Sequence, residues 1–529
     1  MGRKLLTLLG PLYGFLFLSA YVRSASADVV YTDYIRLVNS YLADVTSFKP
    51  YLHGDILTRI PANYPERILN VALFRYSTMF EMLLGCFFLA LSAAVAARYC
   101  RKKEVSLPMT GLLLLFLFSL NKWEMLTNGS GWVHFAAFAL FWHHYYVFDR
   151  VMSGTPRPWD RRQLYLLPWI TILFFGGPYG GVYAVTLLLA DGFFLLFMRR
   201  RPAGSNHVQS GGSGTGSEAS QVDGQAVAEA DQANGSGIDG EAVQTAGRGT
   251  GSEASQVDGR AVARDQRDGI WNDPRENVRR MLCALLPLLL YLVSRALSVE
   301  ERAGATTEPL SAVMRTHPGF LPSLFVRSFS SMVIGAEAGE VLGVTRALSI
   351  ALGLLVLAFY VWAFLINFRG RLYEKTSFPL FLLTAGFLNH VLITLSRWIF
   401  LKDSYGMSSR YALQFQVGIA GILLTFAMAE KTKARTRAMQ FFAALLLIGT
   451  LLTTGREIHM AKYRQEHFTA MQEAALDYEN RSDEELVQVL QYHDPVRIRS
   501  ALKILEDRNL NVFRDGAGAA ETANGAAAQ

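Results

Sequence analysis

Long apolar runs recur along this chain and alternate with short polar connections. Several runs approach the ~20 residues that a helix needs to cross the hydrocarbon core of a bilayer. They mostly lack a 3.6-residue amphipathic pattern, as expected of helices that face lipid, and carry Trp and Tyr near their ends. The pattern predicts an all-α fold, a polytopic transmembrane helix bundle of about eleven spans. The runs are 5–20, 78–97, 107–120, 132–147, 164–176, 180–198, 281–297, 346–366, 377–396, 411–429 and 438–454.

Three runs leave alternatives open. Runs 107–120 and 164–176 are short, and a glycine-rich turn at 176–181 joins the latter to its successor. That pair could be re-entrant instead of spanning, which is tolerated where protein surrounds it. The first run precedes an A-x-A pattern at 25–27, so it is either a retained helix or a cleaved signal peptide.

Charge supports a membrane protein and suggests its orientation. Only 18% of the 529 residues are charged, against about 25% in globular chains, and the net charge is +7. The basic residues cluster at alternate connections, so the positive-inside rule predicts a cytoplasmic N-terminus and an extracytoplasmic C-terminus in a bacterial inner membrane. This composition excludes a soluble enzyme, a nucleic-acid-binding module and a disulfide scaffold. The clusters lie at 3–4, 98–103, 150–162, 199–201, 275–280, 369–375 and 431–437.

Residues 202–278 differ from the rest of the chain. They are rich in Gly, Ser, Ala, Gln and Asp, and the stretch 214–224 recurs at 249–259. Such a segment buries too little apolar surface to fold, so we predict a disordered cytoplasmic linker. The predicted organisation is therefore an N-terminal membrane half, this linker, a C-terminal membrane half and an extracytoplasmic helical tail with a disordered end. Their boundaries are 1–201, 202–278, 279–455 and 456–529.

The predicted outer loop 21–77 carries candidate catalytic groups. Asp33 and Asp55 lie in it, and Asp55 belongs to a His53-Gly54-Asp55 sequence followed by Arg59. A carboxylate near the membrane surface can act as a general base on a hydroxyl group. It can also bind a divalent metal, so such a cofactor stays open. The alternative is a solvated loop held by local salt bridges.

The predicted outer connection 397–410 has an arginine at each end. Arg397 and Arg410 keep their charge and bind phosphate through two parallel hydrogen bonds, and Tyr411 follows at the start of the next run. This pair would suit the phosphates of a lipid-linked donor. The alternative is that both side chains extend to lipid headgroups and anchor the helices.

Polar residues inside the apolar runs have functional and structural interpretations. Asp191, Asn389 and His390 lie within predicted spans, where ionisable groups often mark a transport path or another functional site. Hydrogen bonding within the bundle explains them equally. His143 and His144 suggest an aromatic interfacial belt more than a metal site. No nucleotide-binding loop, zinc-protease motif or serine-nucleophile motif is present.

Two patches resemble those of a group of uncharacterised bacterial polytopic membrane proteins. They are Leu395-Ser396-Arg397-Trp398 with Tyr405-Gly406-Met407-Ser408-Ser409-Arg410-Tyr411, and Asn509-Leu510-Asn511-Val512-Phe513. The wider layout resembles GT-C glycosyltransferases and the O-antigen polymerase and ligase enzymes. That resemblance implies a catalytic carboxylate in the first outer loop, where Asp33 and Asp55 lie, and phosphate-binding arginines, which Arg397 and Arg410 match. The chain departs from the GT-C pattern because no acidic pair follows the first span closely.

The hypothesis favoured by these residues is a membrane glycosyltransferase or polysaccharide polymerase that uses a polyprenyl-phosphate-linked sugar donor at the extracytoplasmic face. Asp55 or Asp33 would be the base, Arg397 and Arg410 would hold the phosphates, and Tyr411 would position the lipid. His53 and Arg59 would contribute to substrate binding. The expected partners are membrane lipid and this donor, with no nucleic acid. One alternative is a transporter or flippase for a lipid-linked or anionic solute, and another is a non-catalytic membrane scaffold.

Overall fold

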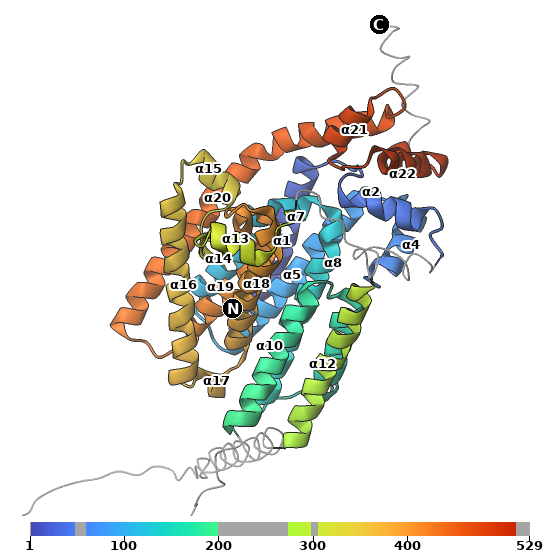
Figure 1. Ribbon diagram of the computed structural model, residues 1–529. Coiled ribbons are helices and arrows are strands. Elements are labelled where there is room, and N and C mark those ends of the chain that lie inside the picture. Colours follow the sequence, from blue (N-terminus) through green and yellow to red (C-terminus); the bar gives the residue numbers. More distant parts are fainter. Residues whose placement is uncertain (1, 48–59, 199–272, 298–304, 515–529) are drawn as a thin grey trace, which may run out of the picture.

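A computed structural model describes residues 2–47, 60–198, 273–297 and 305–514. In these ranges the chain forms helices and no strand, which confirms the predicted all-α class (Figure 1). Short 3₁₀ and π segments are labelled η. The elements are α1 (Gly2–Ala25), α2 (Asp33–Leu37), η1 (Val38–Leu42), α4 (Asn63–Phe74), α5 (Thr78–Lys102), α6 (Leu107–Leu117), η2 (Leu120–Lys122), α7 (Trp123–Thr127), η3 (Gly129–Gly131), α8 (Trp132–Met152), α9 (Asp160–Trp169), η4 (Ile170–Phe175), α10 (Tyr179–Phe193), η5 (Phe194–Met198), α12 (Pro274–Ala296), α13 (Leu310–Thr316), α14 (Phe320–Ser330), α15 (Ala336–Val341), α16 (Arg346–Arg369), α17 (Leu372–Lys375), α18 (Phe378–Arg397), η6 (Trp398–Phe400), η7 (Tyr405–Met407), η8 (Ser409–Tyr411), α19 (Ala412–Met428), α20 (Lys433–Leu476), α21 (Asp483–Leu490), α22 (Pro495–Asp507) and η9 (Asn511–Phe513).

All eleven predicted runs are mainly helical, and nine coincide with helical segments long and apolar enough to cross a membrane. The two others are 132–147, which lies in α8, and 164–176, which lies in α9 and η4. Most residues of α8 are buried among the other helices, so its surface need not be apolar enough for lipid. Run 164–176 contains Pro168 and continues as a π segment. The chain is therefore a multi-pass helical membrane protein.

Three of the basic connections meet at one end of the bundle, which we call the basic end. Lys103 forms an ion pair with Asp149 at 3.3 Å and donates to the Lys375 carbonyl at 3.3 Å. Asp149 also accepts hydrogen bonds from the Thr376 hydroxyl (2.6 Å) and the Ser377 amide (2.8 Å). Connections 98–103, 150–162 and 369–375 thus share one end, as the alternation of charge predicts.

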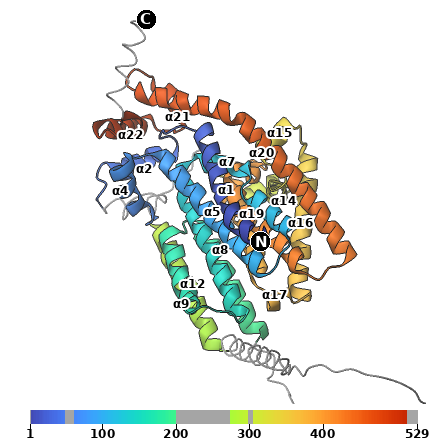
Figure 2. The ribbon, with the colours of Figure 1, turned by 180° about the vertical axis from the view of Figure 1, so that it is seen from behind.

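The opposite end carries the described part of the first loop and the tail, and we call it the loop–tail end. Both ribbon views show α21 and α22 beside α2, with α20 running from the bundle towards them (Figures 1 and 2). Tyr34, Val38 and Leu42 of the loop share one hydrophobic core with Leu490 and Leu502 of the tail. The tail is helical, as predicted, and it packs on the first loop.

The segment between runs 281–297 and 346–366 contributes a helix to the bundle. Within 298–345, helix α14 packs between α16 and α18 instead of lying over the bundle. The Ser328 hydroxyl is 2.8 Å from Nδ1 of His390, and a Cβ on Gly353 would meet the Val326 carbonyl oxygen at 2.1 Å. Because Gly353 has no side chain, α14 can pack closely against the face of α16 that carries it. The sequence 320–330 is too short and too polar to predict this insertion.

The polar residues within the predicted spans have partners in the bundle. Asp191 forms an ion pair with Arg280 at 2.9 Å. Asn389 donates to the Ala385 carbonyl at 2.9 Å, and the His390 ring stacks between aromatic neighbours. His143 bonds to Gln163 at 2.7 Å. The contacts of Asp191, Asn389 and His390 match the structural interpretation of these residues, whereas the hydrogen bond of His143 does not test the predicted aromatic belt.

Candidate functional site

The predicted site residues do not all fall within the described ranges. His53, Asp55 and Arg59 lie outside them. Asp33 begins α2 at the loop–tail end and is half-buried. Arg397, Arg410 and Tyr411 lie at the two ends of the connection between α18 and α19.

A short 3₁₀ turn sets the direction of Arg410. The Ser408 hydroxyl accepts the Arg410 amide at 3.3 Å and caps the turn η8, which leaves Tyr411 buried and Arg410 facing outwards. The Arg410 guanidinium forms an ion pair with Glu124, whose other oxygen accepts the Ser409 hydroxyl at 3.1 Å. About half of the Arg410 side chain remains exposed (52%), so the guanidinium can still reach a ligand.

Arg397 has a different environment. Its guanidinium lies 5.9 Å from the ring centroid of Phe400 and 5.6 Å from that of Tyr411, as in cation–π contacts. Tyr411 is 3% exposed. Arg397 therefore packs against aromatic rings, whereas Arg410 is paired with a carboxylate.

A cavity of about 340 Å³ opens beside Arg410 at the loop–tail end. Four segments that are distant in the sequence supply its walls: the first loop, the 121–131 connection, the 397–411 connection and the tail. Its lining combines a carboxylate, two guanidiniums, an imidazole and several aromatic rings. The lining residues are Tyr31, Trp123, Glu124, Thr127, Asn128, Arg410, Met460, Tyr463, Arg464, His467, Phe468, Met471 and Gln491.

Arg464 is the second guanidinium of this cavity, and a buried carboxylate fixes it. It donates from Nε (3.0 Å) and Nη2 (2.6 Å) to Glu457, which is 1% exposed and also pairs with Arg456. The Arg464 guanidinium lies over the Trp123 ring, 3.1 Å from its centroid. A charge-assisted pair and a ring contact together hold Arg464 in one orientation.

Two more groups shape the cavity. The Tyr31 hydroxyl donates to the Thr127 carbonyl at 3.4 Å, and burial, followed by the charge of Glu124, raises the Tyr31 pKa well above its usual range. Tyr31 therefore stays neutral at physiological pH. Nε2 of His467 lies 3.2 Å from Nε2 of Gln491. The cavity can thus hold an anionic group between arginines and place an apolar or sugar ring against aromatic side chains.

Sequence reasoning missed Glu124, Arg464 and His467. Glu124 follows a tryptophan in a connection that carries one lysine, and Arg464 and His467 are three residues apart on one helix. Three-residue spacing places both side chains on the same helix face, which is the signal available in the sequence. Their position in the same cavity as Glu124 depends on the packing of α20, which the sequence does not reveal.

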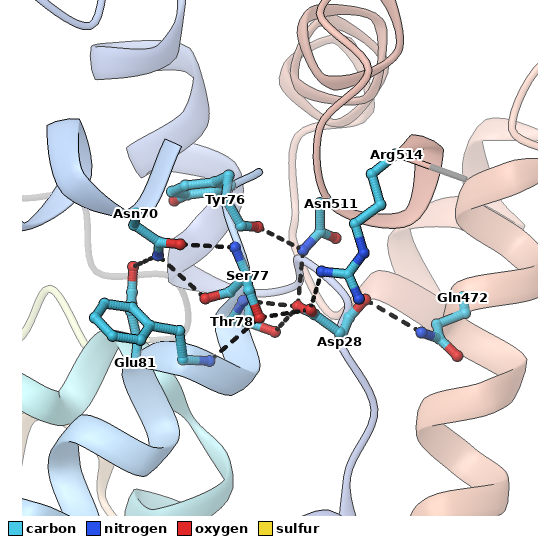
Figure 3. A network of polar contacts seen from close by, with 10 residues as sticks. Asp28, Asn70, Tyr76, Ser77, Thr78, Glu81, Gln472, Asn511 and Arg514 are labelled. Carbon is cyan, nitrogen blue, oxygen red and sulfur yellow. Dashed lines mark hydrogen bonds and ion pairs between the residues drawn. The ribbon is translucent and has the colours of Figure 1, made fainter. Parts of the chain in front are cut away.

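A second polar network joins the tail to the first loop (Figure 3). The Asp28 carboxylate accepts hydrogen bonds from the Ser77 hydroxyl at 2.6 Å and from the Thr78 amide at 2.7 Å. It also accepts the Asn511 side-chain amide at 3.0 Å and forms an ion pair with Arg514 at 2.7 Å. Asn511 belongs to the 509–513 patch, so that patch docks the tail.

Two buried acidic residues, Glu66 and Glu81, lie near each other next to this network. Glu81 accepts the Tyr34 hydroxyl at 2.7 Å and the Asn70 amide at 3.3 Å. Glu66 is 7% exposed, and neither carboxylate oxygen has a hydrogen-bond partner among the described residues. Burial, followed by the charge of Glu81, raises the Glu66 pKa well above its usual range despite the neighbouring Arg67. The uncharged form of Glu66 is therefore favoured more than it is for a glutamate in water.

A third network secures the connection that carries Arg410. The Asp403 carboxylate accepts the Ser323 hydroxyl at 2.6 Å and Nε of Arg346 at 2.8 Å, and it pairs with Arg327. Burial would raise the Asp403 pKa, but the hydrogen bonds and the two positive charges hold it below its usual value. The connection is thereby tied to the inserted helix α14.

Within the described ranges, no group of three His, Cys, Asp or Glu side chains could hold a metal ion. Comparison of the chain with models of known families, with curated proteins and with solved structures found no match.

Proposed function

We propose that this protein transfers a glycosyl group from a polyprenyl-phosphate-linked donor to a hydroxyl acceptor, in the cavity at the loop–tail end. The observation that carries the proposal is the lining of this cavity. It places the guanidiniums of Arg410 and Arg464 beside the rings of Tyr31 and Trp123. Arginine forks bind phosphate oxygens, and aromatic faces accept the apolar faces of sugar rings.

The chemistry needs a base and a stabilised leaving group. A carboxylate takes the proton of the acceptor hydroxyl, and the acceptor oxygen forms a bond to the anomeric carbon of the sugar. The bond from that carbon to the phosphate oxygen breaks, and the phosphate leaves with the electron pair, stabilised by Arg410 and Arg464.

Asp33 is the base that we assign within the described residues. Both oxygens of Glu124 are already engaged, by Arg410 and by Ser409. Asp33 is half-buried and follows Tyr31, which lines the cavity, by two residues. Asp55 remains the alternative base from the sequence.

A transporter has weaker support. It would need a polar path through the middle of the membrane, and Asp191, Asn389 and His390 are engaged by Arg280, by backbone carbonyls and by stacked rings. The pattern of contacts is that of helix packing.

The test is a transfer assay in proteoliposomes with a short-chain polyprenyl-phosphate sugar carrying a radiolabel. We expect Arg410→Ala and Asp33→Asn to lower the transfer rate by at least about 100-fold, in line with the loss of one transition-state hydrogen-bond donor or of a general base. Arg315→Ala is the matched control, because Arg315 lies on α13 and does not line the cavity. Full transfer by both cavity variants, at wild-type protein levels, would refute the proposed function.

A further inference from the structure

The tail layer, defined here as α21, α22 and η9, contacts the first loop through backbone groups as well as side chains. The Thr32 amide donates to the Leu490 carbonyl at 3.0 Å, and Arg508 donates to the Ala43 carbonyl at 2.6 Å. At the other edge, the Asn511 amide donates to the Arg75 carbonyl at 2.8 Å. Asn511 also belongs to the Asp28 network (Figure 3).

Backbone strain concentrates along this contact. Nine non-glycine residues in the described ranges have positive φ angles, and six of them lie in the first loop or the tail layer and its connections. Thr32 is the least favourable, with φ 47° and ψ −121°, because a β-branched residue rarely adopts positive φ. The six are Thr32, Arg75, Tyr76, Gln491, Asn509 and Asn511.

Such strain persists only where surrounding contacts hold it. The strained residues are themselves at the contact points: Thr32 donates to Leu490, and Asn511 donates to the carbonyls of Arg75 and Tyr76. One backbone hydrogen bond at Thr32 is a weak restraint by itself. The charged contacts at Asp28 and the hydrophobic core shared by the first loop and the tail are the further contacts between the two segments.

The strained turn at Thr32 also adjoins the candidate site. Tyr31 on one side lines the cavity, and Asp33 on the other side begins α2. Gln491, which follows the acceptor residue Leu490, lines the same cavity. A shift of this contact would therefore move two walls of the cavity together.

We propose that the tail layer is a clamp: its docking at Asp28 holds the Thr32 turn in its strained conformation and thereby positions Tyr31 in the cavity wall and Asp33 at the start of α2. Asp28, Asn511 and Arg514 are positioning residues in this proposal. It rests on the proposed function only in the role given to Asp33. The clamp itself is a property of the fold and can be measured without substrate.

The test is hydrogen–deuterium exchange on the full-length protein in lipid nanodiscs, followed in peptides covering 29–36 and 505–514. We expect Asp28→Asn to speed exchange at least tenfold in both peptides, since the amide nitrogen of the new residue faces donors and the ion pair with Arg514 is lost. Arg514→Gln is the milder variant and should act in the same direction. Asp44→Asn is the control, since the Asp44 carboxylate accepts bonds from Thr46 within its own loop.

A rescue experiment separates the clamp from simple loss of an anchor. Glycine adopts the backbone conformation of Thr32 without strain, so adding Thr32→Gly to Asp28→Asn should return exchange in 505–514 to within threefold of wild type. Thr46→Gly, at an exposed position without positive φ, should give no rescue. Unchanged exchange in 29–36 on Asp28→Asn, or equal effects of the two glycine substitutions, would overturn the clamp. Loss of sugar transfer without these exchange changes would leave the proposed function standing and refute the clamp alone.

Discussion

Replacement of Glu457 by glutamine tests the electrostatics that hold the cavity together. The Glu457 carboxylate is 1% exposed and neutralises two guanidiniums, those of Arg456 and Arg464. The substitution keeps the shape of the side chain and removes its charge. Removing one partner of a buried ion pair costs about 3–5 kcal/mol, because the remaining charge is left without compensation.

The contacts of the two arginines reduce this cost. Their side chains are 21% and 14% exposed, and Arg464 retains its contact with the Trp123 ring, a type worth about 0.5–2 kcal/mol. We therefore expect Glu457→Gln to lower the free energy of unfolding by about 2–3 kcal/mol, near the lower bound for a buried pair. This is a change of about 30- to 150-fold in the unfolding equilibrium.

The assay is equilibrium unfolding of the purified protein by SDS in mixed micelles. Glu466→Gln is the matched control on the same helix: its pair with Lys462 spans 3.9 Å between side chains that are 60% and 81% exposed. An exposed pair of this kind contributes less than about 1 kcal/mol. Equal unfolding curves for the two variants would refute the reasoning, because the buried position of Glu457 would then have no energetic consequence.

Two further predictions concern pH. The Glu66 pKa is raised in the folded state. Below the ordinary glutamate pKa of about 4.3, Glu66 is protonated in both states and its burial carries no ionisation cost. As pH rises above this value, the unfolded state loses the proton more readily, so the free energy of unfolding falls. Glu66→Gln should therefore raise the thermal midpoint at pH 7.5 and leave it unchanged near pH 4, and a lower midpoint at pH 7.5 would contradict the raised pKa of Glu66. The Asp403 pKa is lowered, so its stabilising effect is present above the ordinary aspartate pKa of about 3.9 and is lost as pH falls below it. Asp403→Asn should lower the thermal midpoint at pH 7, and its difference from wild type should shrink as pH falls below about 3.9. A difference that stays constant from pH 7 to pH 3 would argue against ionisation as the cause.

Local patterns in the sequence predicted most of the fold. The apolar runs became helices because length and hydropathy are properties of a short stretch, and the basic clusters predicted which connections share an end. The tail was predictable as helix because apolar residues recur at helical spacing, as at Leu486 and Leu490 and again at Ile498 and Leu502. Its docking surface was not, since that depends on loop residues more than 400 positions away.

The candidate site was less predictable for the same reason. Arg410 was singled out from the sequence because arginine at a membrane boundary has a limited set of roles, and it lines the cavity in the structure. Arg464 and Glu124 were missed because neither belongs to a recognisable motif in its own segment. They come together only through the packing of α20, which places Arg464 over the Trp123 ring. The insertion of α14 depends on the small residues of its neighbours, which a hydropathy pattern does not record.

Photo-crosslinking with a polyprenyl-phosphate sugar that carries a diazirine on its first isoprene unit tests the central claim most directly. Labelled protein in proteoliposomes would be digested, and the modified peptides identified by mass spectrometry. The account predicts labels within 120–131, 405–414 and 457–472, reduced by Arg410→Ala and by excess unlabelled donor. Labels confined to the basic end, around Arg150 and Asp160, or labels that Arg410→Ala leaves unchanged, would contradict it.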